Sequence, residues 1–347
     1  MGKAALASLT CAFNHTINGA LQMKIFITGG SGFIGTNLIK YLSNLKHEIL
    51  NLDKNPPRDP SQKKYWKEVN ILNKNLLIET MLKFDPEVVL HLAARTDLDG
   101  KTLKDYKENV EGTSNLIECL KLCINLKKVL FFSSRLVCKT GYVPINDTDY
   151  CPSTFYGESK VASEKMIRQK MESSQISWVI LRPTSIWGPW FEIPYKDFFV
   201  SVLKSRYVHP KSMRITKSFG YIGNSVFIIN KFIKLDPIRV TGKTYYLTDY
   251  PEIELKNWAD IISNESGSRA IIEVPVSVLK FIAIFGDMLK ILGYKNPPLT
   301  TFRLNNLLTT VYYDTTELQE LCGELPYSLR DGVTETLSWL HTTDSRD

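Results

Sequence analysis

The stretch "TGGSGFIG", residues 28–35, decides how the rest of the chain is interpreted. It follows the β-prone run "KIFI" and leads into "FIGTNLIKYLSNL", where apolar residues recur at helical spacing. Gly30, Gly32 and Gly35 satisfy the pattern G-x-G-x-x-G, and Gly29 with the last two satisfies the related T-G-x-x-G-x-x-G. A Cβ would obstruct both the sharp turn from strand to helix and the approach of a pyrophosphate to the backbone. The stretch therefore predicts a dinucleotide site at a helix N-terminus.

An acidic residue stands where such a site needs one. Asp53 closes the next β-prone run, "HEILNLD", 18 residues after Gly35. A carboxylate there accepts hydrogen bonds from the adenosine ribose hydroxyls and repels the additional phosphate of NADP. We therefore predict NAD rather than NADP, although Lys54 and Arg58 follow closely and could offset that preference. Asn70, at the end of "KEVN", is a candidate contact for the adenine.

Strand-like and helix-like segments alternate from residue 24 to residue 183, which predicts a parallel sheet covered on both faces. We expect an α/β chain with a Rossmann-type doubly wound sheet over 23–183. After Pro183 the rhythm changes to irregular segments rich in aromatic residues, Pro and Gly, so a smaller mixed C-terminal substrate region is expected over 184–347. Residues 1–22 are expected to be a poorly ordered extension, because "MKIFITGGSGFIG" from Met23 is typical of a protein start.

The segment "YGESK" places Tyr156 and Lys160 four residues apart, with Ser133 and Ser134 upstream in "FFSS". On a helix this spacing returns both side chains to one face. A phenol is a weak base near pH 7, but a neighbouring ammonium favours the phenolate and lowers the pKa of the phenol. The phenol could then exchange a proton with a substrate hydroxyl while a nicotinamide exchanges a hydride. Ser134 could hydrogen-bond the same oxygen.

The composition excludes several other classes of function. The net charge is +7, but Lys and Arg are spread along the chain, so no nucleic-acid partner is expected, and the excess suits an anionic small molecule. Six scattered cysteines without a CxxC pair indicate a reduced, cytoplasmic chain without a metal site. In residues 274–294, Lys280, Asp287 and Lys290 interrupt the apolar run, which predicts an amphipathic helix packed on the domain and no stable membrane insertion.

Taken together, these motifs resemble the extended short-chain dehydrogenase/reductase superfamily in its NAD-dependent epimerase/dehydratase branch. "TGGSGFIG", Asp53, "HLAAR", "ENVEGTSNLIE", "FFSSRLV", "YGESK" and "LRPTSIWGP" follow in the order and spacing of that family, over about residues 23–335. The resemblance implies a Ser134–Tyr156–Lys160 triad, with the lysine also contacting the nicotinamide ribose. It implies that Asn109 supports the active-site helix. It also implies a homodimer, since many relatives pair through the helices near 102–126 and 155–172.

The resemblance also extends the predicted sites. The expected cofactor-binding residues are Gly29, Gly32, Phe33, Ile34, Gly35, Asp53, Asn70, Leu92, Ala93, Ala94, Asn109, Ser133, Tyr156, Lys160, Pro183 and Ser185. The expected substrate-binding residues are Arg95, Thr96, Arg135, Trp187 and Lys217.

Several positions depart from the family pattern. Arg135 and Leu136 stand where the 4,6-dehydratases resembling this chain carry an Asp-Glu pair for elimination, so we do not expect dehydration. Phe219 and Gly220 replace an Arg-Asp pair that clasps a substrate diphosphate in many epimerases, although Lys217 lies close by.

We therefore expect an NAD-dependent enzyme acting on a carbinol carbon of a nucleotide-activated sugar. Epimerisation through a keto-sugar is the first hypothesis and simple reduction follows it. One alternative is a dehydrogenase of a hydrophobic alcohol, like the sterol and flavonol relatives. The other is a non-catalytic NAD-binding module.

Overall fold

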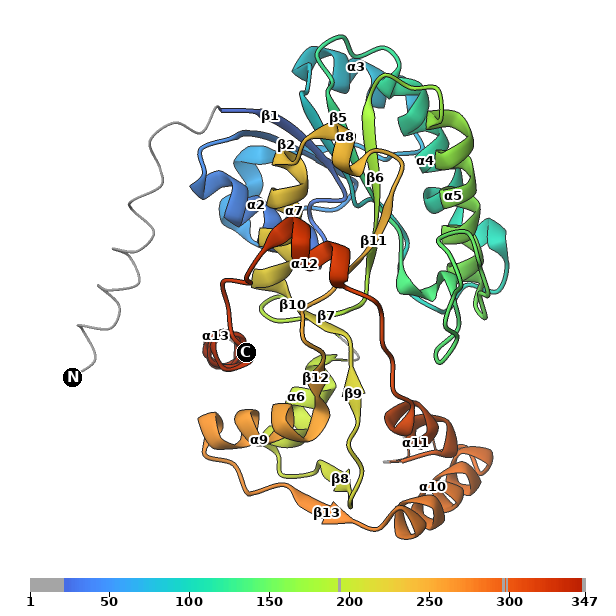
Figure 1. Cartoon of the computed structure of the whole chain (residues 1–347), viewed down its shortest axis with the longest axis vertical. Coiled ribbons are helices and arrows are strands. Elements are labelled where there is room, and N and C mark those ends of the chain that lie inside the picture. The colour runs from blue at the N-terminus through green and yellow to red at the C-terminus, as the bar shows by residue number, and fades with distance from the viewer. Residues whose placement is uncertain (1–21, 193–194, 295–296, 298, 345–347) are drawn as a thin grey trace, which may run out of the picture.

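The computed structural model describes residues 22–192, 195–294, 297 and 299–344. The expected extension, residues 1–22, lies outside the described residues except for Gln22. An α/β layer carrying the N-terminal half of the chain sits above a smaller region built from later segments (Figure 1).

A seven-stranded sheet forms the centre of the upper layer, and every neighbouring pair of its strands is parallel. In spatial order the strands are β11 (Thr244–Leu247), β6 (Ser177–Pro183), β5 (Lys128–Phe132), β4 (Val88–His91), β1 (Lys24–Thr28), β2 (Glu48–Asp53) and β3 (Trp66–Glu68). From β1 the chain first adds β2 and β3 on one side of β1. It then crosses over and adds β4 and the later strands on the other side of β1. That reversal opens a crevice at the carboxyl ends of β1 and β4. The predicted Rossmann-type sheet is confirmed.

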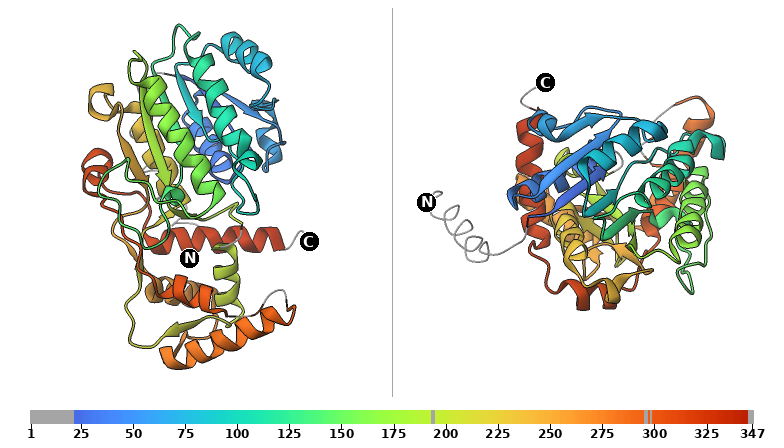
Figure 2. Two further views of the ribbon diagram at one scale, coloured as in Figure 1. Left: turned by 90° about the vertical axis from the view of Figure 1, so that its right-hand side faces the viewer. Right: turned by 90° about the horizontal axis from the view of Figure 1, so that it is seen from above.

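Helices cover both faces of the sheet, because alternate residues of each strand point to opposite sides. Ile25 and Ile27 of β1 belong to one buried cluster, and Phe26 belongs to the other. The first face is covered by α2 (Phe33–Asn44) and α7 (Ile222–Lys234), which contact each other. The second is covered by α3 (Lys74–Phe84), α4 (Lys107–Leu120) and α5 (Phe155–Met171), which pack side by side (Figure 2).

The chain crosses between the two parts more than once. After Pro183 it returns to the upper layer through α7, the short helix α8 (Pro237–Val240) and the edge strand β11. The segments on either side of residue 183 therefore share the upper layer, because the sheet takes its seventh strand from the C-terminal half.

The lower region is a set of short paired strands and helices. Its strands are β7 (Ser185–Trp187), β8 (Val208–Pro210), β9 (Thr216–Lys217), β10 (Phe219–Tyr221), β12 (Ile253–Glu254) and β13 (Ile272–Val274). Its helices, with the C-terminal ones, are α6 (Tyr195–Leu203), α9 (Leu255–Ser266), α10 (Val276–Ile291), α11 (Thr301–Leu308), α12 (Thr316–Cys322) and α13 (Leu329–Asp344). The described residues also form three short 3-10 helices: η1 (Pro60–Tyr65), η2 (Leu103–Tyr106) and η3 (Arg135–Val137).

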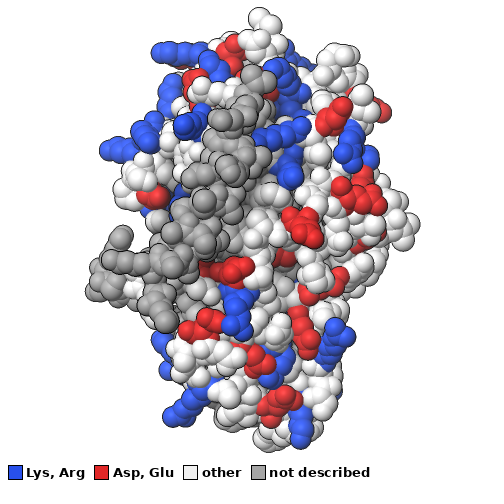
Figure 3. Space-filling view, turned by 60° about the vertical axis from the view of Figure 1, so that its left-hand side comes forward, with Lys and Arg blue, Asp and Glu red and all other residues white. Residues whose placement is uncertain are grey.

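The surface carries both signs of charge. On the face shown in Figure 3, basic and acidic residues are interspersed over the upper and lower parts. No helix within the described ranges is both long enough and apolar enough to cross a bilayer.

Candidate functional site

The glycine turn between β1 and α2 is packed too tightly for side chains. Gly29 has φ +74°, and a Cβ built there would lie 2.4 Å from the backbone nitrogen of Ala93. A Cβ on Gly35 would lie 2.5 Å from Gly30, so the helix starts directly against the turn. Gly32 is the N-cap of α2 and no side chain caps the helix, which leaves first-turn N–H groups available to an anion.

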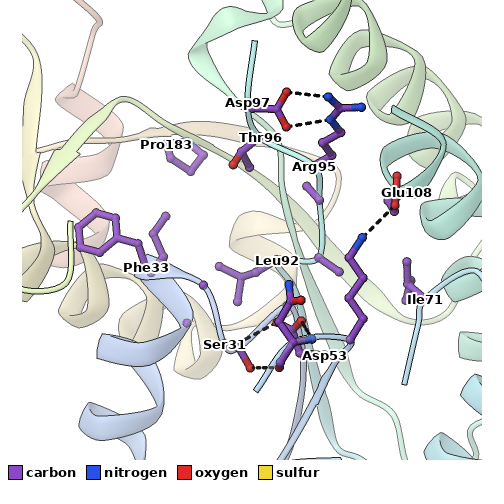
Figure 4. Close-up of a pocket in the computed structure, with 18 of the residues that line it drawn as sticks. Ser31, Phe33, Asp53, Ile71, Leu92, Arg95, Thr96, Asp97, Glu108 and Pro183 are labelled. Carbon is purple, nitrogen blue, oxygen red and sulfur yellow. Dashed lines mark hydrogen bonds and ion pairs between the residues drawn. The ribbon is translucent and has the colours of Figure 1, made fainter. Parts of the chain in front are cut away.

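Asp53 closes this turn from the neighbouring strand. Its carboxylate accepts hydrogen bonds from the backbone N–H of Ser31 at 3.1 Å and of Asn55 at 2.9 Å, and burial raises its pKa (Figure 4). The two nearby cations are held by other carboxylates. Lys54 pairs with Glu108 at 3.0 Å, and Arg58 pairs with Glu192 at 2.9 Å.

The sequence analysis missed one buried residue of β2 that contacts the turn. Asn51 accepts a hydrogen bond from the backbone N–H of Gly30 at 2.9 Å and donates one to Ser31 Oγ at 3.2 Å. It therefore holds the glycine turn in shape from β2. Its position two residues before Asp53, pointing to the same side of the strand, was the available signal.

A cavity of about 750 Å³ opens at the carboxyl ends of the central strands. Most predicted site residues line it: Gly29, Gly32, Phe33, Ile34, Gly35, Asp53, Asn70, Leu92, Ala93, Ala94, Arg95, Thr96, Ser134, Arg135, Tyr156 and Pro183. We call it the main cavity. Arg95 forms a two-point ion pair with Asp97 at its rim (Figure 4). Pro56 and Phe191 also line it and were not predicted.

Tyr156 lies in the first turn of α5, and its side chain is nearly buried at the wall of the main cavity. The helix begins there because Thr154 caps it by accepting a hydrogen bond from the backbone N–H of Gly157. Burial raises the pKa of the Tyr156 phenol to about 12, and a hydrogen bond with Ser134 opposes that shift. Ser134 Oγ in turn accepts the backbone N–H of Leu136 at 3.1 Å.

Lys160 lies one turn further along α5 and is buried behind the tyrosine. Its Nζ donates a hydrogen bond to the backbone oxygen of Phe132 at 2.9 Å, and it does not line the main cavity. Burial lowers the pKa of this ammonium to about 8. The pKa of Tyr156 is thus raised above its ordinary value of 10 rather than lowered, because burial disfavours the charged phenolate.

Polar contacts hold α5 against its neighbours. Asn109 of α4 donates a hydrogen bond to Ser159 Oγ at 2.8 Å and accepts the backbone N–H of Arg95 at 2.8 Å. It thus joins α5 to the loop after β4 from behind the cavity, which it does not line. Glu164 of α5 forms a buried two-point ion pair with Arg182 of β6.

The remaining predicted residues lie elsewhere. Ser133 is buried, and its Oγ has no hydrogen-bond partner among the described residues. Trp187 is fully buried against the rings of Phe199, Tyr221 and Trp258. The predicted substrate contact of Trp187 does not fit this structure, because the indole is sealed inside an aromatic core rather than placed over the cavity.

A second, smaller cavity of about 170 Å³ lies between the two parts of the molecule. Arg135, Thr140, Ser185, Lys217, Ser218, Phe219, Asn306 and Val311 line it, and we call it the side cavity. Lys217 Nζ donates to the backbone oxygen of Asn306 at 2.6 Å, and burial with the nearby Arg135 lowers its pKa to about 8. Arg135 lines both cavities and so stands at the boundary between them.

Comparison with known protein families shows that residues 25–209 match the model of the "NAD dependent epimerase/dehydratase family". N-acetyl-alpha-D-glucosaminyl-diphospho-ditrans,octacis-undecaprenol 4-epimerase of Escherichia coli O157:H7 is 23% identical over 91% of this chain and 95% of its own length. Sterol-4-alpha-carboxylate 3-dehydrogenase (decarboxylating) of Candida albicans is 23% identical over 92% of this chain and 97% of its own.

A solved structure shows the same fold. UDP-glucuronic acid 4-epimerase from Bacillus cereus, solved with NAD, superposes with a TM-score of 0.70 at 19% identity, covering 93% of this chain and 98% of that one.

Proposed function

The chain belongs to the NAD-dependent epimerase/dehydratase family, and from this premise we propose that it inverts a hydroxyl-bearing carbon of a nucleotide-activated sugar. One observation carries the proposal: the cavity that begins at the glycine turn and Asp53 ends at Ser134 and Tyr156. A dinucleotide site and a proton-transferring phenol therefore share one space. The glycine turn suits a pyrophosphate, since it packs so closely on the loop after β4 that a Cβ at Gly29 would lie 2.4 Å from the backbone nitrogen of Ala93.

We propose NAD as the cofactor in preference to NADP. Asp53 stands where the ribose hydroxyls would lie, and the ion pairs of Lys54 and Arg58 draw both cations toward carboxylates. A 2′-phosphate would meet a carboxylate without a free cation to balance it. The Bacillus cereus epimerase, solved with NAD, supports this choice by analogy.

The side chains around Tyr156 have distinct roles in the proposed reaction. Bound NAD would accept the hydride from the carbinol carbon and return it to the other face. The Tyr156 side chain acts as the base in its deprotonated phenolate form: the phenolate takes the hydroxyl proton of the substrate and later returns it, while Ser134 donates a hydrogen bond to the same oxygen. Lys160 is cationic at pH 7, below its pKa of about 8, and its charge lowers the free energy of a phenolate.

We place the substrate diphosphate near the junction of the two cavities. Arg135 and Lys217 supply positive charge there, where the family's usual Arg-Asp pair is replaced by Phe219 and Gly220. Two cations close together suit two phosphate groups. Leu136, which also lines the main cavity, offers neither an acid nor a base for eliminating water.

The test compares Tyr156→Phe with Tyr312→Phe, a control at a tyrosine that is 56% exposed. Both proteins are incubated with NAD and a panel of UDP-hexoses and polyprenyl-diphosphate-linked sugars, and the products are separated by chromatography. Tyr156→Phe should lose at least a hundredfold in turnover while binding NAD as before. Unchanged turnover in Tyr156→Phe would remove the mechanism. A 4-keto-6-deoxy product from the unsubstituted protein would restore dehydration as the activity.

A second candidate function is the oxidation of a hydrophobic alcohol. The similarity to a sterol dehydrogenase and the apolar surface of α10 favour it. NADH formation with sterols, measured beside the sugar panel, separates the two: turnover of a sterol alone would replace the sugar proposal.

A further inference from the structure

Helix α10 carries its large apolar side chains on the side that faces solvent. Phe281, Ile284, Phe285, Met288, Ile291 and Leu292 are between 55% and 85% exposed. We call them the α10 outer face. The expectation of an amphipathic helix packed on the domain holds for only part of this segment, since a surface helix ordinarily puts polar residues outward.

The orientation of α10 is set by close packing on its other side. Leu279, Ala283 and Gly286 are the buried residues of the helix. A Cβ on Gly286 would lie 1.8 Å from the backbone oxygen of Leu299, so the helix meets the following segment without a gap. The Asp287 carboxylate also accepts the backbone N–H of Thr301 at 3.2 Å. The helix therefore cannot rotate to bury its outer face.

Helix α10 stands at one end of the molecule. Figure 1 shows it at the lower end, far from the seven-stranded sheet. Phe302, at the start of the neighbouring helix α11, and Ile272 of β13 are 74% and 64% exposed as well. Exposed apolar side chains gathered in this way mark an interaction site.

The charged residues of this region decide between possible occupants. At about 100° per residue, Lys280 and Lys290 fall outside the arc of the outer face. Neither they nor Arg303 of α11 forms an ion pair among the described residues, whereas the one acidic residue of α10, Asp287, is engaged with Thr301. Apolar side chains flanked by unpaired cations are the pattern of a helix that lies in the interface of an anionic membrane.

We propose that the α10 outer face docks the protein on an anionic lipid bilayer, with α10 lying in the plane of the interface. Its six large side chains enter the boundary between headgroups and acyl chains, and Lys280, Lys290 and Arg303 contact anionic headgroups. Helix α11, which packs against α10, also carries Asn306, which lines the side cavity. The proposal does not depend on the substrate suggested above.

Vesicle flotation tests the proposal, using phosphatidylcholine vesicles with and without phosphatidylglycerol. The unsubstituted protein should float with the mixed vesicles. Phe281→Ser/Phe285→Ser should bind them at least tenfold more weakly while keeping its NAD affinity. Ile238→Ser, at a 91% exposed residue of α8, is the matched control and should bind as before. Lys280→Glu/Lys290→Glu should abolish the preference for phosphatidylglycerol.

Three outcomes would overturn the proposal. The first is an unsubstituted protein that binds neither vesicle. The second is a Phe281→Ser/Phe285→Ser variant that binds as well as the control. The third is a vesicle-free protein that is dimeric in gel filtration and becomes monomeric on the same substitution, which would assign the surface to a second copy of the chain.

Discussion

The buried ion pair between α5 and β6 makes a quantitative test of how the catalytic helix is held. Arg182 and Glu164 are both fully buried, and two nitrogen–oxygen contacts of 2.9 and 2.7 Å join them. Arg182 also donates to the backbone oxygen of Asp147 at 2.6 Å, and Tyr150 donates its hydroxyl to Glu164 at 3.0 Å. Arg182→Met removes the close cation and leaves the Glu164 carboxylate with only Arg168, whose nitrogen lies 3.9 Å away.

The expected cost follows from this geometry. Breaking a buried pair by removing one partner costs about 3–5 kcal/mol, because an uncompensated charge stays in the interior. For a chain of this size that loss corresponds to a fall in Tm on the order of 10 °C. Glu164 lies one turn beyond Lys160 on α5, so turnover should fall as well.

Urea unfolding followed by fluorescence measures the change, with Arg330→Met as the matched control. Arg330 forms an ion pair with Glu265 at 3.1 Å, but its side chain is 66% exposed, so its removal should cost less than about 1 kcal/mol. The double variant Arg182→Met/Glu164→Leu should be more stable than Arg182→Met alone, since it carries no unpaired charge.

Two results would refute this reasoning. A loss in Arg182→Met no larger than that in Arg330→Met would mean that the buried pair contributes little to the fold. A double variant less stable than both single variants would mean that the cost arises from lost packing rather than from the unpaired charge.

Three further predictions concern the cofactor turn and one buried acid. Asp53→Ala should weaken the binding of NAD more than that of NADP in titrations followed by fluorescence, and equal losses would contradict our choice of cofactor. Gly29→Ala should lower NAD affinity at least tenfold, because the new Cβ meets Ala93; Gly267→Ala, also at positive φ (+68°) but with no atom within 4 Å, should leave NAD affinity unchanged. Burial raises the pKa of Asp249 from 3.8 to about 7, so the native state retains a proton that the unfolded chain loses, and this group lowers stability as pH rises from about 4 through 7. The stability of Asp249→Asn relative to the unsubstituted protein should therefore increase by about 2–3 kcal/mol when the pH is raised from 5 to 8, as measured by urea unfolding. A stability difference that does not change with pH would show that the carboxyl titrates normally.

Local features of the sequence were sufficient to predict the glycine turn and the helix that carries Tyr156. The glycine positions follow from backbone geometry within eight residues, and the helix of Tyr156 follows from a Thr cap and the spacing of its own residues. Such signals depend on contacts between near neighbours in the chain, so they can be recognised without the fold.

The positions of several other residues depended on contacts between distant segments. Trp187 was expected to bind the substrate but packs against Phe199, Tyr221 and Trp258. Lys160 had the expected spacing, yet its Nζ is drawn to the Phe132 carbonyl, 28 residues away. The local sequence pattern could predict neither the aromatic neighbours of Trp187 nor the hydrogen bond of Lys160.

The sequence by itself determined the family, the parallel sheet and the dinucleotide turn, because these depend on backbone conformation and hydrophobic period. Only the tertiary structure decided that β11 returns to complete the sheet, that Arg135 lines two cavities, and that the apolar side of α10 faces outward. Those features depend on contacts between segments that are far apart in the chain. Because the hydrophobic effect is non-directional, a sequence pattern does not show which of these segments pack against each other.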